Sequence, residues 1–311
     1  MPARAQAWVV SLTPFDDRGE LDEPAFRAHL QRMRESGIGV YVGSSNAGEG
    51  FTLSAKERDR VFTIAAEELK GLVPVRAGGC EPQSIAAALD YLRAASVAGL
   101  DAAHLFPLDT GHAGALRPAE IERYYLQVLD AATLPVVISN YPAMGYTVSV
   151  PLVARLLDRF PQIIAVRDAG TDPAYLRELA AACAGRAGLY TGGIRNLMTA
   201  FWHGSRGFLS SEANIAPALA VAFARAFDAG DFAAIGEMHA HLYRLHEFVN
   251  QFGGSAGRGI KPLLAAFGLP GGCLRSPRIP LHGAEVADMV AAYRALGLPA
   301  ALAAGPTASR A

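Results

Sequence analysis

The sequence predicts an α/β protein, a (β/α)8 TIM barrel followed by a C-terminal helical extension. Short apolar runs alternate with longer amphipathic stretches, which is typical of repeated βα units around a parallel sheet. Eight such runs precede residue 211, and eight strands close a barrel of this kind. At 311 residues, the chain has an ordinary length for one barrel domain with a large core.

The eight runs are short and apolar, as buried parallel strands require. We expect strands at Ala7–Leu12, Val40–Gly43, Val73–Ala77, Ala102–Phe106, Pro135–Ser139, Ile163–Arg167, Ala187–Thr191 and Gly207–Ser210.

Helical patterns fill the intervals between these strands. Examples are Glu23–Ser36, Ala55–Lys70, Ser84–Ala98, Pro118–Ala132 and Val150–Arg159. Two helices have recognisable starts: Ser54-Ala55-Lys56-Glu57 is a capping box, and Arg117-Pro118 places proline near a first turn.

Beyond Ser210 the pattern is helical only. We expect helices at Ala216–Asp228, Asp231–Phe252, Lys261–Phe267 and Gly283–Leu296. The chain therefore divides into a barrel core at 1–214, the last barrel helix with the C-terminal extension at 215–298, and a tail at 299–311. The tail lacks periodicity, and we expect it to be disordered.

Composition excludes several classes of protein. Hydrophobic residues make up 51% of the chain and charged residues 18%, so general disorder is excluded. The formal net charge is −1 and no basic run occurs, so we expect neither nucleic acid nor a membrane surface as partner. The start of the chain lacks a signal-peptide core, and no run of about 18 apolar residues occurs. We therefore expect a cytoplasmic protein whose partner is a small molecule.

Signals for metals and cofactors are missing from the sequence. The three cysteines are odd in number and widely spaced, which favours reduced thiols over a disulfide framework or a zinc site. No Walker loop and no His-Glu-x-x-His motif occurs, and the glycine-rich run at 253–257 follows a predicted helix instead of a strand. The histidines at 239, 241 and 246 favour a surface face of a helix. We expect no metal and no cofactor.

The active site of such a barrel lies at the carboxyl ends of its strands. The segments that the predicted topology brings to this mouth are Thr13-Pro14, Gly43–Glu49, Gly78–Cys80, Pro107–His112, Ser139–Pro142, Arg167-Asp168, Thr191–Ile194 and Ser210–Asn214.

Several motifs follow one another in a specific order between about Val9 and Leu281. They are Ser11–Phe15, Gly48–Ser54, Asn140-Tyr141-Pro142, Thr191-Gly192-Gly193 and Gly207–Asn214. In order and spacing they resemble the dihydrodipicolinate synthase / N-acetylneuraminate lyase family. The resemblance implies a (β/α)8 barrel that acts on a 2-oxo acid through a lysine Schiff base. It also implies a homo-oligomer, a dimer or tetramer.

The positions that carry this family's reaction depart from its pattern. The strand-end lysine of the family aligns with Arg167, and a protonated, delocalised guanidinium cannot form an imine. The family's tyrosine after the fifth strand aligns with Ser139, while Tyr141 lies two residues further on, on the same face if the chain stays extended. The family's Pro-Tyr-Tyr appears as Pro107-Leu108-Asp109, and the loop Gly43–Glu49 is longer by about two residues.

These comparisons and the mouth segments give a set of candidate residues. We expect the catalytic residues to be Arg167, Tyr141, Ser139 and His112, and the substrate-binding residues to be Ser44, Ser45, Asn46, Thr13, Asp109, Gly192 and Ser210. Arg167 would bind a carboxylate or a developing enolate. The loop at 44–46 would donate hydrogen bonds, and Tyr141 or His112 would transfer a proton.

Each candidate has an alternative without function. Arg167 would then be held internally by Asp168, Glu49 or Glu212. The Ser/Asn cluster would be an ordinary turn, and the ring of Tyr141 would pack at the mouth. Asp109 and His112 would belong to a solvated loop.

Three neighbouring features are expected to be structural. Cys80 would be a small apolar residue, and Asp168 would cap the next helix. The chain's lysines, Lys56, Lys70 and Lys261, are expected to lie on helices and not to replace the missing imine.

The sequence therefore predicts a lyase-type enzyme that acts on a 2-oxo acid or related carboxylate without a lysine Schiff base. Two alternatives stay open. One is a non-catalytic carboxylate-binding paralogue, a sensor or partner subunit. The other is a different reaction, such as a hydration or a cyclisation in a specialised pathway.

Overall fold

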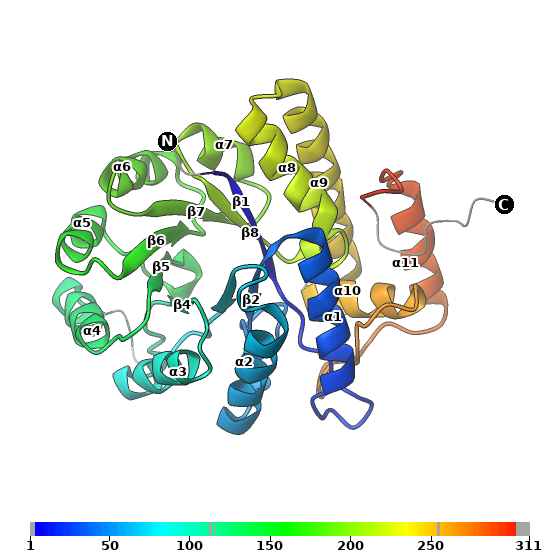
Figure 1. The fold of residues 1–311 in the computed structure, drawn as a ribbon, viewed down its shortest axis with the longest axis horizontal. Coiled ribbons are helices and arrows are strands. Elements are labelled where there is room, and N and C mark those ends of the chain that lie inside the picture. Colours follow the sequence, from blue (N-terminus) through cyan, green and yellow to red (C-terminus); the bar gives the residue numbers. More distant parts are fainter. Residues whose placement is uncertain (1–3, 112–113, 115, 254–255, 303–311) are drawn as a thin grey trace.

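The computed structural model describes residues 4–111, 114, 116–253 and 256–302, and their strands form one closed parallel barrel (Figure 1). The strands are β1 (Gln6–Val10), β2 (Gly39–Val42), β3 (Val75–Ala77), β4 (Ala102–Leu105), β5 (Val136–Asn140), β6 (Ile163–Asp168), β7 (Gly188–Gly192) and β8 (Gly207–Ser210). They lie in sequence order, and β8 closes the barrel by pairing with β1, with Trp8 opposite Leu209. The predicted (β/α)8 barrel is confirmed, and the strand ends differ from the predicted ones by at most two residues.

Eight helices surround the barrel, one after each strand. They are α1 (Glu23–Ser36), α2 (Ala55–Leu69), α3 (Ile85–Val97), α4 (Pro118–Asp130), α5 (Val150–Arg159), α6 (Pro173–Cys183), α7 (Leu197–Trp202) and α8 (Pro217–Ala229). Ser54 caps α2 in a full capping box with Glu57, and Pro118 is the first residue of α4. Both predicted helix starts are confirmed.

The interior of the barrel is filled by side chains of its strands. Trp8, Tyr41 and Tyr190 pack together there. The guanidinium of Arg76 lies 4.0 Å from the centroid of the Trp8 ring, and it donates a hydrogen bond of 2.9 Å to the hydroxyl of Tyr41. Large rings and a stacked cation thus close the barrel below its mouth.

In the described part of the chain, three further helices form the extension: α9 (Phe232–Gly253), α10 (Ala256–Ala266) and α11 (Ala284–Ala295). They lie on one side of the barrel, next to α1 and α8 (Figure 1). Helix α10 begins earlier than the predicted start at Lys261. The glycines before Lys261 allow this because they permit close packing: a Cβ at Gly259 would lie 2.7 Å from the carbonyl oxygen of Val249.

A buried ion pair fastens the extension to the barrel. Nζ of Lys261 lies 2.5 Å from Oε1 of Glu49, and it donates to the carbonyl oxygens of Thr13 and Cys273. Both charged side chains are almost fully buried. The loop after β2, which borders the mouth, is therefore held by a residue of α10.

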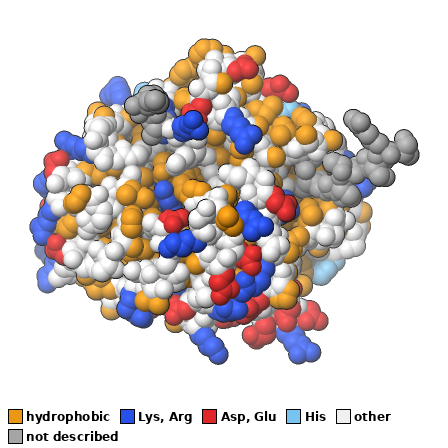
Figure 2. Space-filling view, viewed as in Figure 1, with side chains coloured by type: hydrophobic (Ala, Val, Ile, Leu, Met, Phe, Trp, Pro, Cys, Tyr) orange, Lys and Arg blue, Asp and Glu red, His pale blue; other side chains and the backbone are white. Residues whose placement is uncertain are grey.

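The surface carries charges of both signs. Figure 2 shows acidic and basic side chains intermixed on the face it presents, and they gather over α1 and α2. Arg27 pairs there with Glu67 and Glu68, and Arg60 with Glu23. Within the described ranges, no helix has the length and apolar character needed to cross a membrane. Residues 299–302 of the expected tail form a turn, and 303–311 lie outside the described residues.

Candidate active site at the barrel mouth

A cavity of about 240 Å³ opens at the carboxyl ends of the strands. At roughly 30 Å³ per water molecule, it holds about eight waters, which suits a small ligand. Six of the predicted residues line it: Ser44, Ser45, Asn46, Tyr141, Arg167 and Gly192. They come from the loops after β2 and β5 and from the ends of β6 and β7. The structure therefore brings together residues that are far apart in the sequence.

Arg167 is the only arginine or lysine that lines this cavity among the described residues. It pairs in register with Ser139 on β5 and Tyr190 on β7. Its Nη1 donates to Oγ of Ser139 at 3.3 Å, and its buried Nε has no hydrogen-bond partner in the described structure. Burial lowers the pKa of Arg167 from its ordinary value, but a guanidinium stays protonated at any physiological pH.

The three acids considered as internal partners of Arg167 bind other groups. Glu49 pairs with Lys261, and Glu212 pairs with His246. Asp168 accepts hydrogen bonds from the side-chain amide of Asn140 and from the backbone of Gly170. No ion pair joins Arg167 to an acidic residue anywhere in the described ranges.

The guanidinium of Arg167 fits between a glycine and two aromatic rings. A Cβ at Gly192 would lie 2.3 Å from its Nη2, so only glycine leaves room for it there. Its Cζ lies 5.6 Å from the ring centroid of Tyr141 and 5.8 Å from that of Phe106. The two rings are perpendicular to each other at 5.7 Å. Arg167 therefore has a fixed orientation.

The loop after β2 forms one wall of the cavity. Ser44 lies against Gly78, where a Cβ would come within 1.8 Å of its Oγ. Ser45 donates to the carboxylate of Glu81 at 3.2 Å. Glu81, which also lines the cavity, was not among the predicted residues.

Four other predicted residues do not line the cavity. Ser139 is buried behind Arg167, and Ser210 is buried with its hydroxyl donating to Glu212. Thr13 is buried, and its carbonyl accepts from Lys261. Asp109 accepts from the backbone of Gly111 in a loop away from the cavity lining.

Two further expectations have different outcomes. His112 lies outside the described residues. Asp168 does not cap the following helix: Asp172 is the N-cap of α6, because its carboxylate accepts from the backbone of Ala174.

Two histidines of the cavity were missed by sequence reasoning. His104 lies on β4, with its ring tilted against that of Phe106 at 4.6 Å between centroids, and its Nε2 is buried without a partner in the described structure. Burial lowers the pKa of His104 well below its ordinary value, and the charges of Arg167 and Arg76 add to this, so the ring is neutral. A polar residue within an apolar strand was the available signal.

His246 comes from α9, where the sequence favours a surface position. Instead it lines the cavity, with Nδ1 2.7 Å from Oε1 of Glu212. The expectation of a plain surface histidine is therefore wrong for this residue. The periodicity of the sequence does not predict the position of His246 at the cavity, because that position depends on how α9 packs over the barrel.

The sequence of this chain matches the model of the Dihydrodipicolinate synthetase family over residues 5–295. The chain belongs to this family. A 4-hydroxy-tetrahydrodipicolinate synthase of Phenylobacterium zucineum is 28% identical over 288 residues, which cover 92% of this chain and 95% of that protein. One of Brucella abortus is 30% identical over 274 residues, 88% of this chain and 92% of the other.

Solved structures of the dihydrodipicolinate synthetase family have the same fold. YagE, a prophage protein from E. coli K12 solved in complex with pyruvate, is 25% identical, with a TM-score of 0.86 over 95% of this chain and 99% of that one. A dihydrodipicolinate synthase from Bacillus anthracis is 23% identical, with a TM-score of 0.84 over 96% and 99% of the two chains.

The lysines of this family member all lie within the described ranges, and none lines the mouth cavity. Lys261 is buried in its pair with Glu49. Lys70, at the end of α2, donates a hydrogen bond to the carbonyl of Gly99. Lys56 lies in the first turn of α2, outside the barrel.

The described residues do not favour a metal site or a reactive cysteine. No group of three or more His, Cys, Asp or Glu side chains could hold a metal ion there. The thiol of Cys80 is largely buried and donates a weak hydrogen bond to the carbonyl of Gly43. Burial raises the pKa of Cys80 to about 12, so it is not a thiolate at neutral pH.

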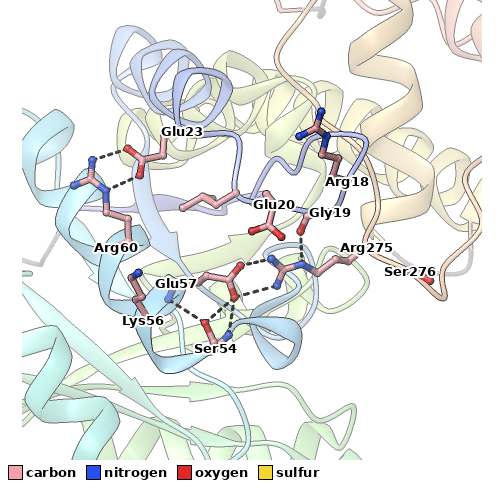
Figure 3. Close-up of a pocket in the computed structure, with 11 residues that line it drawn as sticks. Arg18, Gly19, Glu20, Glu23, Ser54, Lys56, Glu57, Arg60, Arg275 and Ser276 are labelled. Carbon is pink, nitrogen blue, oxygen red and sulfur yellow. Dashed lines mark hydrogen bonds and ion pairs between the residues drawn. The ribbon is translucent and has the colours of Figure 1, made fainter.

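A larger hollow of about 710 Å³ lies outside the barrel mouth. It is lined by the loop before α1, the start of α2 and residues 275–276 (Figure 3). Two ion pairs lie in it, Arg60 with Glu23 and Arg275 with Glu57 (Figure 3), and its lining also includes Arg18, Glu20 and Lys56. The mouth cavity is smaller, but six of the predicted residues line it, and it is therefore the candidate site.

Proposed function

We propose that this chain is a lyase-type enzyme that acts on a 2-oxo acid or a related carboxylate without a lysine Schiff base. In this proposal Arg167 occupies the place of the family's lysine and binds the carboxylate or the developing enolate of the substrate. Family membership and the relatives named as synthases support the reaction class. Pyruvate, bound in the YagE structure, is the smallest 2-oxo acid that can form an enolate.

One observation carries the proposal: the cation of Arg167 lies in the cavity wall without an acidic partner, and its Nε has no hydrogen-bond partner in the described structure. A buried charge that is left unpaired costs several kcal/mol. A ligand carboxylate at this cation would remove that cost. A planar guanidinium also binds a carboxylate through two parallel hydrogen bonds.

The neighbouring groups supply what such a ligand needs. Ser44, Ser45 and Asn46 offer hydroxyl and amide donors for its remaining oxygens. Tyr141 is next to Arg167 and donates a proton to the oxygen of an enolate as that charge develops. The fixed positive charge of Arg167 stabilises the same enolate, which is the role an imine nitrogen has in the lysine mechanism.

Borohydride trapping tests the absence of an imine. The protein is incubated with pyruvate and sodium borohydride, and its intact mass is measured. We expect an unchanged mass, because no lysine lines the cavity. A mass increase that maps to Lys56, Lys70 or Lys261 would contradict the proposal.

A second candidate function follows from the same observation. A cavity that holds an anion-binding arginine but no lysine also fits a non-catalytic carboxylate-binding paralogue, a sensor or partner subunit. A thermal-shift screen with 2-oxo acids, followed by turnover assays on each compound that stabilises the protein, separates the two. Stabilisation without turnover of any compound favours the binding protein.

Cellular location and assembly also belong to this proposal. We place the protein in the cytoplasm as a homo-oligomer, a dimer or tetramer. Size-exclusion chromatography with light scattering tests the assembly.

A further inference from the structure

The wall of the mouth cavity contains an acid–histidine pair in addition to Arg167. Glu212 belongs to the short helix η3 (Glu212–Asn214) after β8, and His246 belongs to α9. Oε1 of Glu212 lies 2.7 Å from Nδ1 of His246, and both residues line the cavity. A carboxylate that orients an imidazole in this way is a common arrangement for a general base.

The hydrogen bonds define the tautomer of His246. Nε of Arg195 donates to Nε2 of His246 at 3.3 Å, and a guanidinium nitrogen can only donate. Nε2 therefore carries the lone pair, and Nδ1 carries the proton that it donates to Glu212. The nitrogen able to accept a proton is the one turned away from Glu212.

The carboxylate of Glu212 is held firmly. Its second oxygen, Oε2, accepts from Oγ of Ser210 at 2.7 Å, and that hydroxyl in turn accepts from the backbone of Ala213. Burial raises the pKa of Glu212, but the bonds from His246 and Ser210 outweigh it and lower the pKa overall. An ionised, fixed carboxylate stabilises the imidazolium that forms when Nε2 takes a proton.

The partners of Nε2 are different in kind. Asn250, at 3.0 Å, and Arg195 are both exposed side chains. Exposed side chains exchange readily between water and protein partners, so a ligand in the cavity can displace them. Nδ1 of His246 is thus fixed by Glu212, and Nε2 is available to a ligand.

We propose that His246, oriented by Glu212, is the base that removes a proton from C3 of the 2-oxo acid bound at Arg167. This inference rests on the proposed function. In the step the C3–H bond breaks, and its electron pair forms the C2–C3 double bond of the enolate. The electron pair of the carbonyl π bond moves to the oxygen, and the proton goes to Nε2 of His246. The reverse step returns a proton to C3.

The other polar groups of the cavity are less suited to this step. The low pKa of His104 makes it a poor proton acceptor. The carboxylate of Glu81 is already occupied, because it accepts a hydrogen bond of 3.2 Å from Ser45 of the loop proposed to bind the ligand. Tyr141 acts in the proposal as an acid at the oxygen. His246 is thus the base, and Tyr141 its complement.

Exchange of the methyl hydrogens of pyruvate in D2O tests the inference without knowledge of the second substrate. Proton NMR follows the loss of the methyl signal with wild-type protein, His246→Gln and the control His239→Gln, and thermal shift measures pyruvate binding by each. The control histidine lies two turns earlier on α9 and does not line the cavity. We expect wild-type protein and the control to exchange at rates within about twofold of each other. The His246→Gln rate should fall about 100-fold or more, the usual size of a general-base effect.

Binding separates the possible results. Stabilisation by pyruvate should persist in His246→Gln, because Arg167 is intact. If exchange survives in His246→Gln, this inference is wrong and the proposed function stands. If pyruvate stabilises wild-type protein but no exchange occurs, this inference is wrong and the non-catalytic carboxylate-binding protein is favoured. If neither pyruvate nor 2-oxobutyrate stabilises wild-type protein, the proposed function fails and the inference falls with it.

A second variant guards against misfolding of the first. His246→Ala removes the ring, and added imidazole should restore part of the exchange rate by filling the space. Exchange that imidazole does not raise would count against a role of the ring in proton transfer.

Discussion

The guanidinium of Arg167 lies against the backbone of Gly192, in the space that any larger residue would occupy: an added Cβ would lie 2.3 Å from Nη2 and 2.7 Å from Nε. β6 and β7 are neighbouring strands, and the two residues meet at their carboxyl ends. The glycine therefore determines where the positive charge of the cavity lies. Since only the outer end of a flexible side chain would clash, a substitution should move the charge without unfolding the barrel.

Gly192→Ala is therefore expected to weaken pyruvate binding at least about tenfold, or about 1.4 kcal/mol, because the guanidinium must rotate away from its place. Calorimetric titration measures this. Gly236→Ala is the matched control, since nothing lies within 4 Å of a Cβ there. It should leave binding unchanged and stabilise α9 by about 0.5–1 kcal/mol. Normal binding by Gly192→Ala would show that the position of Arg167 is unimportant.

Arg167→Lys is expected not to restore ordinary aldolase activity. A lysine at this position can in principle form an imine, but the family's tyrosine aligns with Ser139, and Pro107-Leu108-Asp109 stands where the family has Pro-Tyr-Tyr. Both proton relays would still be missing. Turnover assays combined with borohydride trapping check this, and aldolase turnover at the level of the lysine-containing relatives would contradict it.

The pair of Lys261 and Glu49 supports a prediction about stability. Lys261→Met leaves the buried carboxylate of Glu49 without its cation, which should cost about 3–5 kcal/mol of unfolding free energy. Adding Glu49→Gln to it should recover part of this loss. Urea denaturation measures both, with the exposed Lys56→Met as a control that changes stability by less than about 0.5 kcal/mol. A cost below 1 kcal/mol for Lys261→Met would contradict the assigned role.

His29 predicts a pH dependence of stability. Burial lowers its pKa to about 3, the charge of Arg32 adds to this, and the ring bonds to Oδ1 of Asn214 at 2.9 Å. Between pH 6.5 and about 3 the unfolded chain therefore binds a proton that the native protein does not. Stability is lost as the pH falls through this window, by up to about 1.4 kcal/mol per pH unit from this residue.

His29→Gln isolates that contribution. The difference in unfolding free energy between wild-type protein and this variant should shrink as the pH is lowered below 6.5, because both share every other titrating group. Urea denaturation at several pH values between 7 and 4 provides the data. A difference that stays constant over this range would mean that His29 titrates normally.

The sequence was informative wherever a local pattern determines structure. Alternating apolar and amphipathic segments were sufficient for the barrel, because each βα unit buries its own strand. The candidates from two loops and two strand ends converged in one cavity, because the carboxyl ends of parallel strands meet at one edge. Ser139 and Ser210 lie at the carboxyl ends of their strands, as predicted, but they do not line the cavity. Their hydroxyl groups form hydrogen bonds with Arg167 and Glu212 instead.

Features that depend on packing between distant segments were not predictable. His246 lies 34 residues beyond Glu212, and only the path of α9 over the barrel brings the two together. The early start of α10 depends on glycines that read as a loop but permit close contact with Val249. Arg76 and His104 are a different case: each is a polar residue within an apolar strand, and this local signal indicates a position inside the barrel.

The most direct test of the central claim is the affinity for pyruvate of wild-type protein and Arg167→Ala, measured by isothermal titration calorimetry under identical conditions. If Arg167 binds the ligand carboxylate, the substitution removes charge-assisted hydrogen bonds worth about 1.5–3 kcal/mol, and the dissociation constant should rise about 10- to 150-fold while the protein stays folded. Equal affinity in the two proteins would contradict the claim and leave Arg167 a structural residue.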